Sequence, residues 1–356
     1  MCGMEQVLPI TPQPAVQAGD RAARRQVAAW LLVCCALVFA MVVVGGVTRL
    51  TRSGLSIVEW EPLIGAIPPL SQNDWEQLFR EYQATPEYQK VNFDMSLDAF
   101  KGIFWWEYFH RLLGRMSGLA FLLPLLYFIW RRKVPRGLAP RLLGIFLLGG
   151  LQGAVGWWMV ASGLIDDPRV SHVRLSIHLG MAFLIFAAML WTALDLLADG
   201  ARAPGAPGSA RWVGALPVLI FVMVLSGALV AGTRAGYAYN TFPLMNGHFF
   251  PPEYFMMQPW WDNLLHNMAT VQFNHRLIAW ALFLLIPLAW WSVRASSSRE
   301  VRLAATLLLA MAGVQIALGI ATLLLQVPVA LGSAHQAGAM VLFALSLWLA
   351  HANRRT

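Results

Sequence analysis

Eight long apolar stretches dominate this sequence and limit the folds that are open to it. A helix rises about 1.5 Å per residue, so about 20 residues cross the ~30 Å hydrocarbon core of a bilayer. The composition, 58% hydrophobic and only 12% charged, is typical of a membrane protein with many spans and excludes a soluble domain. The predicted spans are residues 27–47, 105–130, 139–161, 174–196, 212–232, 269–292, 301–325 and 329–350.

Lysine and arginine residues gather in alternate short loops and account for the net charge of +8. Loops rich in these residues face the cytoplasm, so both termini are predicted to be cytoplasmic. The long loops 48–104 and 233–268 then lie on the outer side, and residues 71–83 predict a capped interfacial helix there. Because the charge follows membrane topology, we expect no nucleic acid partner. Cys34 and Cys35 lie inside the first span and are expected to be packing residues.

The sequence divides into two related halves. A stretch rich in Gly, Pro and Ala at 199–211 predicts a flexible linker between residues 1–198 and 212–356. His-Arg-Leu opens a span in each half, at His110 and at His275. Each following span carries a glutamine and a glycine four residues apart: Gln152 and Gly156, Gln315 and Gly319. Four spans per half predict a parallel repeat. We therefore predict an all-α membrane protein whose eight transmembrane helices form two pseudo-symmetric four-helix bundles.

Four of the eight histidines lie at similar depth near the outer ends of spans, two in each half. They are His110, His178, His275 and His335. Paired imidazoles on facing helices commonly bind haem iron, and an apolar bundle suits a porphyrin. A helix-packing role is the alternative for any one of them, but matched depth in a repeat favours haem. Zinc and copper are less favoured metals, because no cysteine or aspartate cluster accompanies the histidines.

The remaining histidines are predicted to be solvated or interfacial. His172, His248 and His266 fall in predicted outer loops, and His351 lies at the inner end of the last span.

Two arginines directly follow candidate ligands, Arg111 after His110 and Arg276 after His275. Haem propionates at an interface require cations, so both arginines are candidate cofactor-binding residues. Snorkelling or bonding to the backbone is the alternative. Weaker candidates of the same kind are Arg49, Arg52, Arg174 and Arg234.

One carboxylate distinguishes the halves. Glu107 precedes His110 by three residues, whereas the matched position in the second half is Gln272. A carboxylate one turn from a haem ligand can take up protons or stabilise developing positive charge, which makes Glu107 the candidate catalytic residue. The alternative is that Glu107 is merely hydrated among lipid headgroups.

Taken together, these stretches resemble the haem A synthase family, in the subgroup without loop cysteine pairs. The resemblance extends over nearly the whole chain. It is carried by GGVTRLTRSGLSIVEWEP (45–62), FWWEYFHRLLGR (104–115), LQGAVGWWMVASGL (151–164), VSHVRLSIHLG (170–180), AGTRAGYAYNTFPLMNG (231–247), VQFNHRL (271–277) and VPVALGSAHQ (327–336).

The resemblance implies that a porphyrin methyl group of haem O is oxidised to a formyl group, giving haem A for cytochrome oxidase. It implies that His110 and His178 hold haem O, with Glu107 beside the methyl group. His275 and His335 would ligate a haem b that transfers electrons. It further implies a location in the bacterial inner membrane, with the haem sites near the periplasmic face. Haem O synthase and cytochrome oxidase assembly factors are the partners that this pathway suggests, and a homo-oligomer is a further option.

Without the resemblance, the residues indicate only a membrane protein that binds two haems and carries out redox chemistry. A cytochrome b-type electron carrier linked to quinone is one alternative. A transporter built from a parallel repeat is another, although no span carries a relay of charged residues. A reduced-minus-oxidised spectrum would separate the haem proteins from the transporter.

Overall fold

The computed structural model describes residues 18–60, 64–198 and 211–354, and these residues are helical apart from loops and one isolated β-bridge. Eight of the described helices are long and apolar enough to cross a membrane, as the sequence predicts. They are α1 (Ala18–Leu50), α4 (Leu97–Trp130), α5 (Ala139–Ala161), α6 (His172–Leu197), α7 (Leu216–Thr233), α10 (Met268–Val293), α11 (Arg299–Leu324) and α12 (Val329–Asn353). The predicted linker at 199–211 lies, except for residue 211, outside the described residues.

Most helix boundaries agree with the predicted spans, but α1 and α4 begin well before residues 27 and 105. The first residue of α4 is Leu97, and the hydroxyl of Ser96 caps this helix by accepting a hydrogen bond from the N–H of Ala99. At about 1.5 Å per residue its 34 residues extend over ~51 Å, more than the ~30 Å hydrocarbon core. The first turns of α4 therefore project from the membrane and support the loops around them.

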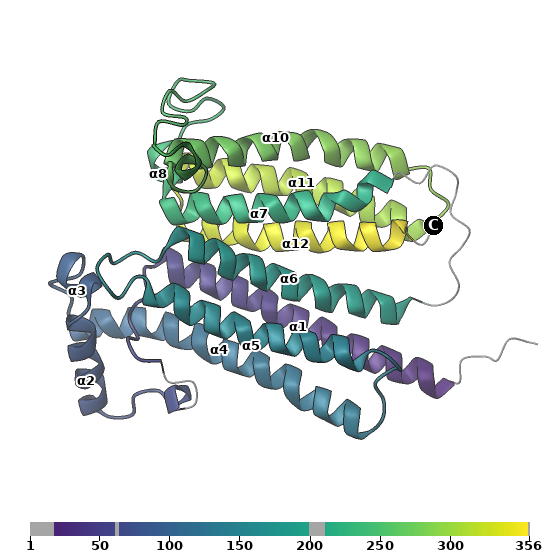
Figure 1. Ribbon diagram of the computed structural model, residues 1–356, viewed down its shortest axis with the longest axis horizontal. Helices are drawn as coiled ribbons and strands as arrows, with labels where there is room; N and C mark the ends of the chain where they lie inside the picture. The colour runs from purple at the N-terminus through teal and green to yellow at the C-terminus, as the bar shows by residue number, and fades with distance from the viewer. Residues whose placement is uncertain (1–17, 61–63, 199–210, 355–356) are drawn as a thin grey trace, which may run out of the picture.

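The spanning helices pack in two groups of four (Figure 1). Helices α1, α4, α5 and α6 form the first group, and α7, α10, α11 and α12 form the second. The groups meet where α1 and α6 lie against α7 and α12. Phe183 of α6 and Phe343 of α12, whose ring centroids are 5.4 Å apart, are among the buried residues of this contact. Cys34 and Cys35 are buried, which confirms their role in packing.

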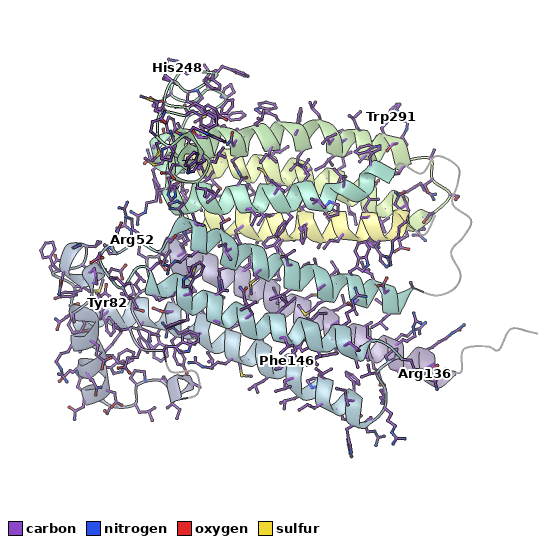
Figure 2. The ribbon with its side chains drawn as sticks, viewed as in Figure 1. Arg52, Tyr82, Arg136, Phe146, His248 and Trp291 are labelled. Atoms are coloured by element: carbon purple, nitrogen blue, oxygen red, sulfur yellow. The ribbon has the colours of Figure 1, made fainter. Side chains whose placement is uncertain are left out.

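Both long loops lie at one end of the molecule, which we call the loop end (residues 51–96 and 234–267; Figures 1 and 2). The predicted interfacial helix is present as α2, where Ser71 and Asp74 form a capping box. A buried aromatic cluster of Tyr82, Phe100, Phe104 and Tyr108 fixes α2 to α4. The short helices of this end are α2 (Gln72–Gln83), α3 (Pro86–Lys90), α8 (Ala235–Ala238), α9 (Asn263–His266) and 3-10 turns at Ile64–Ala66 and Trp260–Asp262; a third 3-10 turn, Arg211–Ala215, precedes α7.

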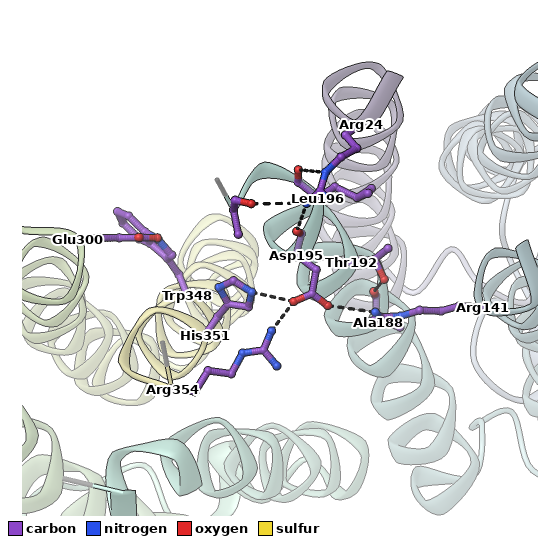
Figure 3. Close-up of polar contacts among 11 residues, drawn as sticks. Arg24, Arg141, Ala188, Thr192, Asp195, Leu196, Glu300, Trp348, His351 and Arg354 are labelled. Carbon is purple, nitrogen blue, oxygen red and sulfur yellow. Dashed lines mark hydrogen bonds and ion pairs between the residues drawn. The ribbon is translucent and has the colours of Figure 1, made fainter. Parts of the chain in front are cut away.

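A polar cluster around Asp195 joins the two groups at the opposite end (Figure 3). The carboxylate of Asp195 on α6 lies 3.1 Å from Nη1 of Arg141 on α5 and 3.0 Å from Nε2 of His351 on α12, and it also pairs with Arg354. Arg24 of α1 donates to the backbone carbonyl of Asp195 at 3.0 Å. The prediction that His351 is solvated or interfacial is wrong, because the contact between α6 and α12 leaves its side chain 2% exposed.

We expect Asp195→Asn to reduce stability, because the substitution removes a charge that three cationic or imidazole groups share. Hydrogen bonds to charged groups contribute about 1.5–3 kcal/mol when buried, and this carboxylate is 32% exposed, so a loss of about 1–3 kcal/mol is expected. Thermal unfolding in detergent measures the effect. Asp98→Asn is the matched control, since that side chain is 92% exposed and pairs with Lys101 alone among the described residues. Equal stability of the two variants would contradict the assignment.

Candidate functional site

The four predicted histidines lie on four different helices, two in each group. His110 is on α4 and His178 on α6, while His275 is on α10 and His335 on α12. All four are half-buried. Each group therefore contains one pair of histidines, as the sequence predicts.

Every one of these imidazoles packs against a glycine on a neighbouring helix. A Cβ added to Gly156 would lie 2.8 Å from Cε1 of His178, and one added to Gly319 would lie 2.9 Å from Cε1 of His335. A Cβ added to Gly45 would lie 3.0 Å from Nε2 of His110, and one added to Gly227 would lie 3.2 Å from Cε1 of His275. Contacts this short are rare for real Cβ atoms. Glycine thus creates the space that each imidazole occupies, in both groups.

Glutamines and one serine support these histidines. Gln152 donates its amide N–H to the backbone carbonyl of His178 at 3.0 Å, and Gln315 does the same to His335 at 2.9 Å. The glutamines therefore bridge neighbouring helices. The partner of His275 is a serine: Ser226 Oγ of α7 lies 2.8 Å from Nδ1 of this histidine. That bond fixes the orientation of the ring and leaves Nε2 available as a ligand.

Glu107 is not hydrated among headgroups: the residue is 2% exposed. Its Oε2 accepts hydrogen bonds from the N–H and hydroxyl of Ser56, at 2.7 and 2.8 Å, and from the N–H of Ile57 at 3.0 Å. Its Oε1 accepts bonds from Nη2 and Nε of Arg111, at 2.7 and 3.1 Å. Five donors therefore hold one carboxylate against the loop that follows α1, one turn before His110.

The second group uses the matched positions to hold its own loop. Gln272 donates to the carbonyl of Tyr239 at 2.8 Å, and Arg276 donates to the carbonyl of Thr241 at 2.7 Å. Glu107 accepts hydrogen bonds from backbone N–H groups of its loop, whereas Gln272 donates a hydrogen bond to a backbone carbonyl of its loop. The matched positions therefore bind the loop backbone in opposite directions, one as an acceptor and the other as a donor.

Both candidate propionate-binding arginines bond to loop backbone. Arg111 donates to the carbonyls of Ile57 and Glu59, at 2.7 and 2.9 Å, and Arg276 to four carbonyls of residues 239–244. Backbone bonding, the alternative to a propionate role, is thus observed. Propionate binding by these arginines stays a prediction.

Further cations lie where the two groups meet at the loop end. Arg49 of α1 donates to the carbonyl of Ala231 of α7, which connects the groups. Burial lowers the pKa of the nearby Arg234 guanidinium, and the charges of Arg52 and Arg169 lower it further. This concentration of positive charge would favour an anionic ligand.

An apolar groove of about 290 Å³ lies beside His110 on the surface of α1 and α4. It is lined by Val44, Phe109, Leu112, Leu113 and Met116.

The donor sets fit a haem better than a bare metal ion. No group of three or more His, Cys, Asp or Glu residues in the described part of the chain could hold an ion. Haem iron requires only one or two imidazoles from the protein, and the porphyrin supplies its other ligands. Nδ1 of His335 is buried without a hydrogen-bond partner among the described residues, so this imidazole has capacity for a ligand.

Sequence reasoning missed one pair of histidines at the loop end. Nε2 of His172 lies 3.0 Å from Nδ1 of His266, so the start of α6 contacts α9. The two residues are 94 positions apart, and no local pattern indicated the contact.

The sequence model of a family of cytochrome oxidase assembly proteins matches residues 28–347 of this chain. A haem A synthase of Nitrosospira multiformis is 61% identical over 94% of this chain and 95% of its own length. Those of Nitrosomonas eutropha and Parvibaculum lavamentivorans are 56% and 50% identical, each over 91% of this chain and over 92% and 93% of their own lengths.

We expect Gly319→Ala to weaken haem binding at the His335 pair, because the added methyl group would displace the imidazole. Overpacking of this kind costs about 1–3 kcal/mol, equivalent to roughly 5–150-fold in affinity. The b-type absorbance of the purified protein measures the loss. Gly313→Ala on the same helix is the control, since its Cβ would meet nothing within 4 Å. The same haem content in both variants would argue against the close packing as the cause.

Proposed function

The chain belongs to the family of cytochrome oxidase assembly proteins, and we propose that it acts as a haem A synthase. In this function it oxidises a methyl group of haem O to a formyl group and yields haem A for cytochrome oxidase. The observation that carries the proposal is the combination of two matched histidine pairs with one buried carboxylate, Glu107, beside only one of them.

The histidine pairs receive different roles. We assign His110 and His178 to the substrate, haem O, because Glu107 lies one turn from His110. We assign His275 and His335 to a haem b, which supplies one-electron transfer when bound. In this pair Ser226 Oγ holds the His275 ring at Nδ1, which leaves Nε2 available to the haem iron.

Glu107 supplies fixed negative charge close to the reacting methyl group. Removing electrons from a porphyrin methyl group leaves positive charge on carbon, and an oriented carboxylate in a low-dielectric site stabilises such charge. The bonds from Ser56 and Ile57 fix its orientation, and the guanidinium of Arg111 pairs with its other oxygen. The apolar groove on α1 and α4, which Phe109 helps to line, offers a lipophilic substrate a surface near the site.

We also propose an orientation of the protein in the membrane. We propose that the chain lies in the bacterial inner membrane with both termini in the cytoplasm and the loop end in the periplasm. Haem O synthase and cytochrome oxidase assembly factors are the proposed partners, as the source of the substrate and the users of the product. The two four-helix groups then act as a substrate domain and an electron-transfer domain.

We expect cells that contain this protein and haem O to form haem A, and the Glu107→Gln variant to form little or none while it keeps its b-type absorbance. Loss of one electrostatic group of this kind costs about 10²–10³-fold in rate. Pigment extraction and chromatography measure the product. If the wild-type protein bound haem but formed no haem A, a cytochrome b-type electron carrier would be the better description. Normal yield from Glu107→Gln would remove that residue from the chemistry.

We expect His275→Ala or His335→Ala to abolish the b-type absorbance, because each removes an axial ligand of the proposed haem b. His110→Ala is the matched control in the other pair and should keep that band while it loses haem O binding. A reduced-minus-oxidised spectrum of the purified variants provides the measurement. The roles of the two pairs are reversed if the band disappears only in His110→Ala.

A further inference from the structure

The second long loop exposes an unusual amount of apolar surface. We call residues 242–265 the apolar loop, because they include no lysine or arginine and only two acidic residues, Glu253 and Asp262. Five apolar residues of this loop are more than half exposed: Phe249 (82%), Met256 (69%), Trp260 (59%), Trp261 (56%) and Phe250 (54%). Exposing such residues to water is costly, so we looked for what covers them.

The aromatic rings of the apolar loop form one continuous surface. Successive ring centroids lie between 4.5 and 6.4 Å apart along the series Phe250, Tyr254, Phe255, Trp260 and Trp261. Apolar residues that are scattered singly over a surface are normal, whereas a connected apolar patch marks a contact with another molecule or with a membrane.

The polar groups of the apolar loop point inward. Asn263 is fully buried, and its Nδ2 donates to the carbonyls of Met257 and Trp260 at 2.8 and 2.9 Å. Its Oδ1 accepts a hydrogen bond from the N–H of Met257 at 2.9 Å. Asn267, which caps α10, donates to the carbonyl of Glu253 at 2.8 Å. Polar side chains inside and apolar side chains outside are the reverse of what a loop in water requires.

The first long loop has the opposite arrangement. The apolar residues Trp75, Leu78 and Phe79 of α2 pack against the buried aromatic cluster that fixes α2 to α4. The exposed residues of α2 are polar or charged, namely Gln72, Asn73, Asp74, Glu76, Gln77 and Arg80. This loop is therefore built to face water, and the contrast shows that the apolar loop is not typical of the loop end.

The two loops also extend in different directions. Figure 1 shows α2 and α3 beyond the ends of the spanning helices, whereas the apolar loop extends sideways past the start of α10. His248 lies at the outer edge of this loop in Figure 2. Because the spanning helices cross the bilayer, a loop that extends sideways from their ends lies along the surface of a leaflet.

The surface of the apolar loop continues into the lipid-facing side of α10. The rings of Phe242 and Trp280 are stacked with centroids 6.4 Å apart, and Trp280 contacts Phe283 at 5.8 Å. On α10, Leu277, Trp280 and Leu284 are 57%, 48% and 61% exposed. Their spacing of three and four residues puts them on one helical face, which in a spanning helix faces hydrocarbon.

We propose that the apolar loop inserts into the membrane leaflet at the loop end, so that its partner is a lipid surface. Its aromatic and methionine side chains lie just below the headgroups, at the depth of about 5–10 Å that is typical of interfacial segments. Tryptophan favours this level of a bilayer. The inference concerns the position of the loop in the membrane and holds for any reaction at the histidine pairs.

Lipid fits this surface better than a protein partner does. Protein interfaces are edged by a polar rim, whereas the apolar loop passes at Phe242 into the lipid-facing side of α10 without one. Because the loop has no lysine or arginine, its insertion does not require anionic headgroups. Neutral phosphatidylcholine is therefore a sufficient probe.

We expect a spin label on the apolar loop to be reached by oxygen, which dissolves in lipid, and to lose contact with a water-soluble nickel chelate. The label is attached at Phe249→Cys or at Trp260→Cys in the full-length protein, in phosphatidylcholine nanodiscs. Cys2→Ser removes one native cysteine, and the other two, Cys34 and Cys35, are buried. Power saturation of the electron paramagnetic resonance spectrum measures contact with each reagent.

Glu76→Cys on the exposed face of α2 is the matched control, and its label should remain accessible to the chelate. Equal access of the chelate to Phe249→Cys and to Glu76→Cys would place the apolar loop in water and overturn the proposal. Shielding of the apolar loop from both reagents would mean that a protein, such as a second copy of this chain, covers it. That result would also overturn the proposal.

Hydroxyl-radical labelling tests the same position in the wild-type protein, so that no variant has to fold. Met256 of the apolar loop and Phe93 of the first long loop are both 69% exposed. Methionine is oxidised readily, yet we expect Met256 in nanodiscs to be modified less than Phe93, because acyl chains keep water away from it. Equal or greater modification of Met256 would contradict insertion.

Discussion

Hydrocarbon cannot hydrogen-bond, so each polar group inside the spanning helices must find its partner within the protein. The two helix groups meet this constraint in the same way for most of these polar groups, while Gln152 Oε1, Gln315 Oε1 and His335 Nδ1 have no partner among the described residues. Gln152 and Gln315 bond to the backbone at a histidine on the next helix, and Thr48 and Thr192 bond back to carbonyls of their own helices. The imidazoles themselves fit only because glycines face them. Close helix contacts and satisfied polar groups therefore determine where the histidines lie.

The backbone of the long loops also needs hydrogen-bond partners, and residues of the spanning helices supply some of them. Glu107 and Arg111 hold the loop after α1, while Gln272 and Arg276 hold the loop after α7. The difference between glutamate and glutamine thus has a structural component, since one accepts and the other donates. It also places a carboxylate at this position in the first helix group and an uncharged amide at the matched position in the second. A single substitution can therefore preserve loop packing and still place charge beside one histidine pair alone.

Hydropathy was sufficient to predict the spans, because length and composition decide whether a helix can cross a membrane. The repeat predicted the four histidines, and the Gln–Gly spacing hinted at the glycines that face two of them. Tertiary packing determined what the sequence could not indicate. His351 is buried because α12 meets α6, and Glu87 is buried because α2 and α3 fold onto the projecting turns of α4. Neither contact has a local sequence pattern.

The contacts between the two helix groups lie at both ends of the molecule. Arg49 reaches α7 at the loop end, and Asp195 binds His351 and Arg354 at the opposite end. Two bodies fastened at both ends can neither hinge nor slide freely. Any electron exchanged between the histidine pairs would therefore cross a gap whose width is set by packing. Its rate would depend on the difference in reduction potential and not on a domain motion.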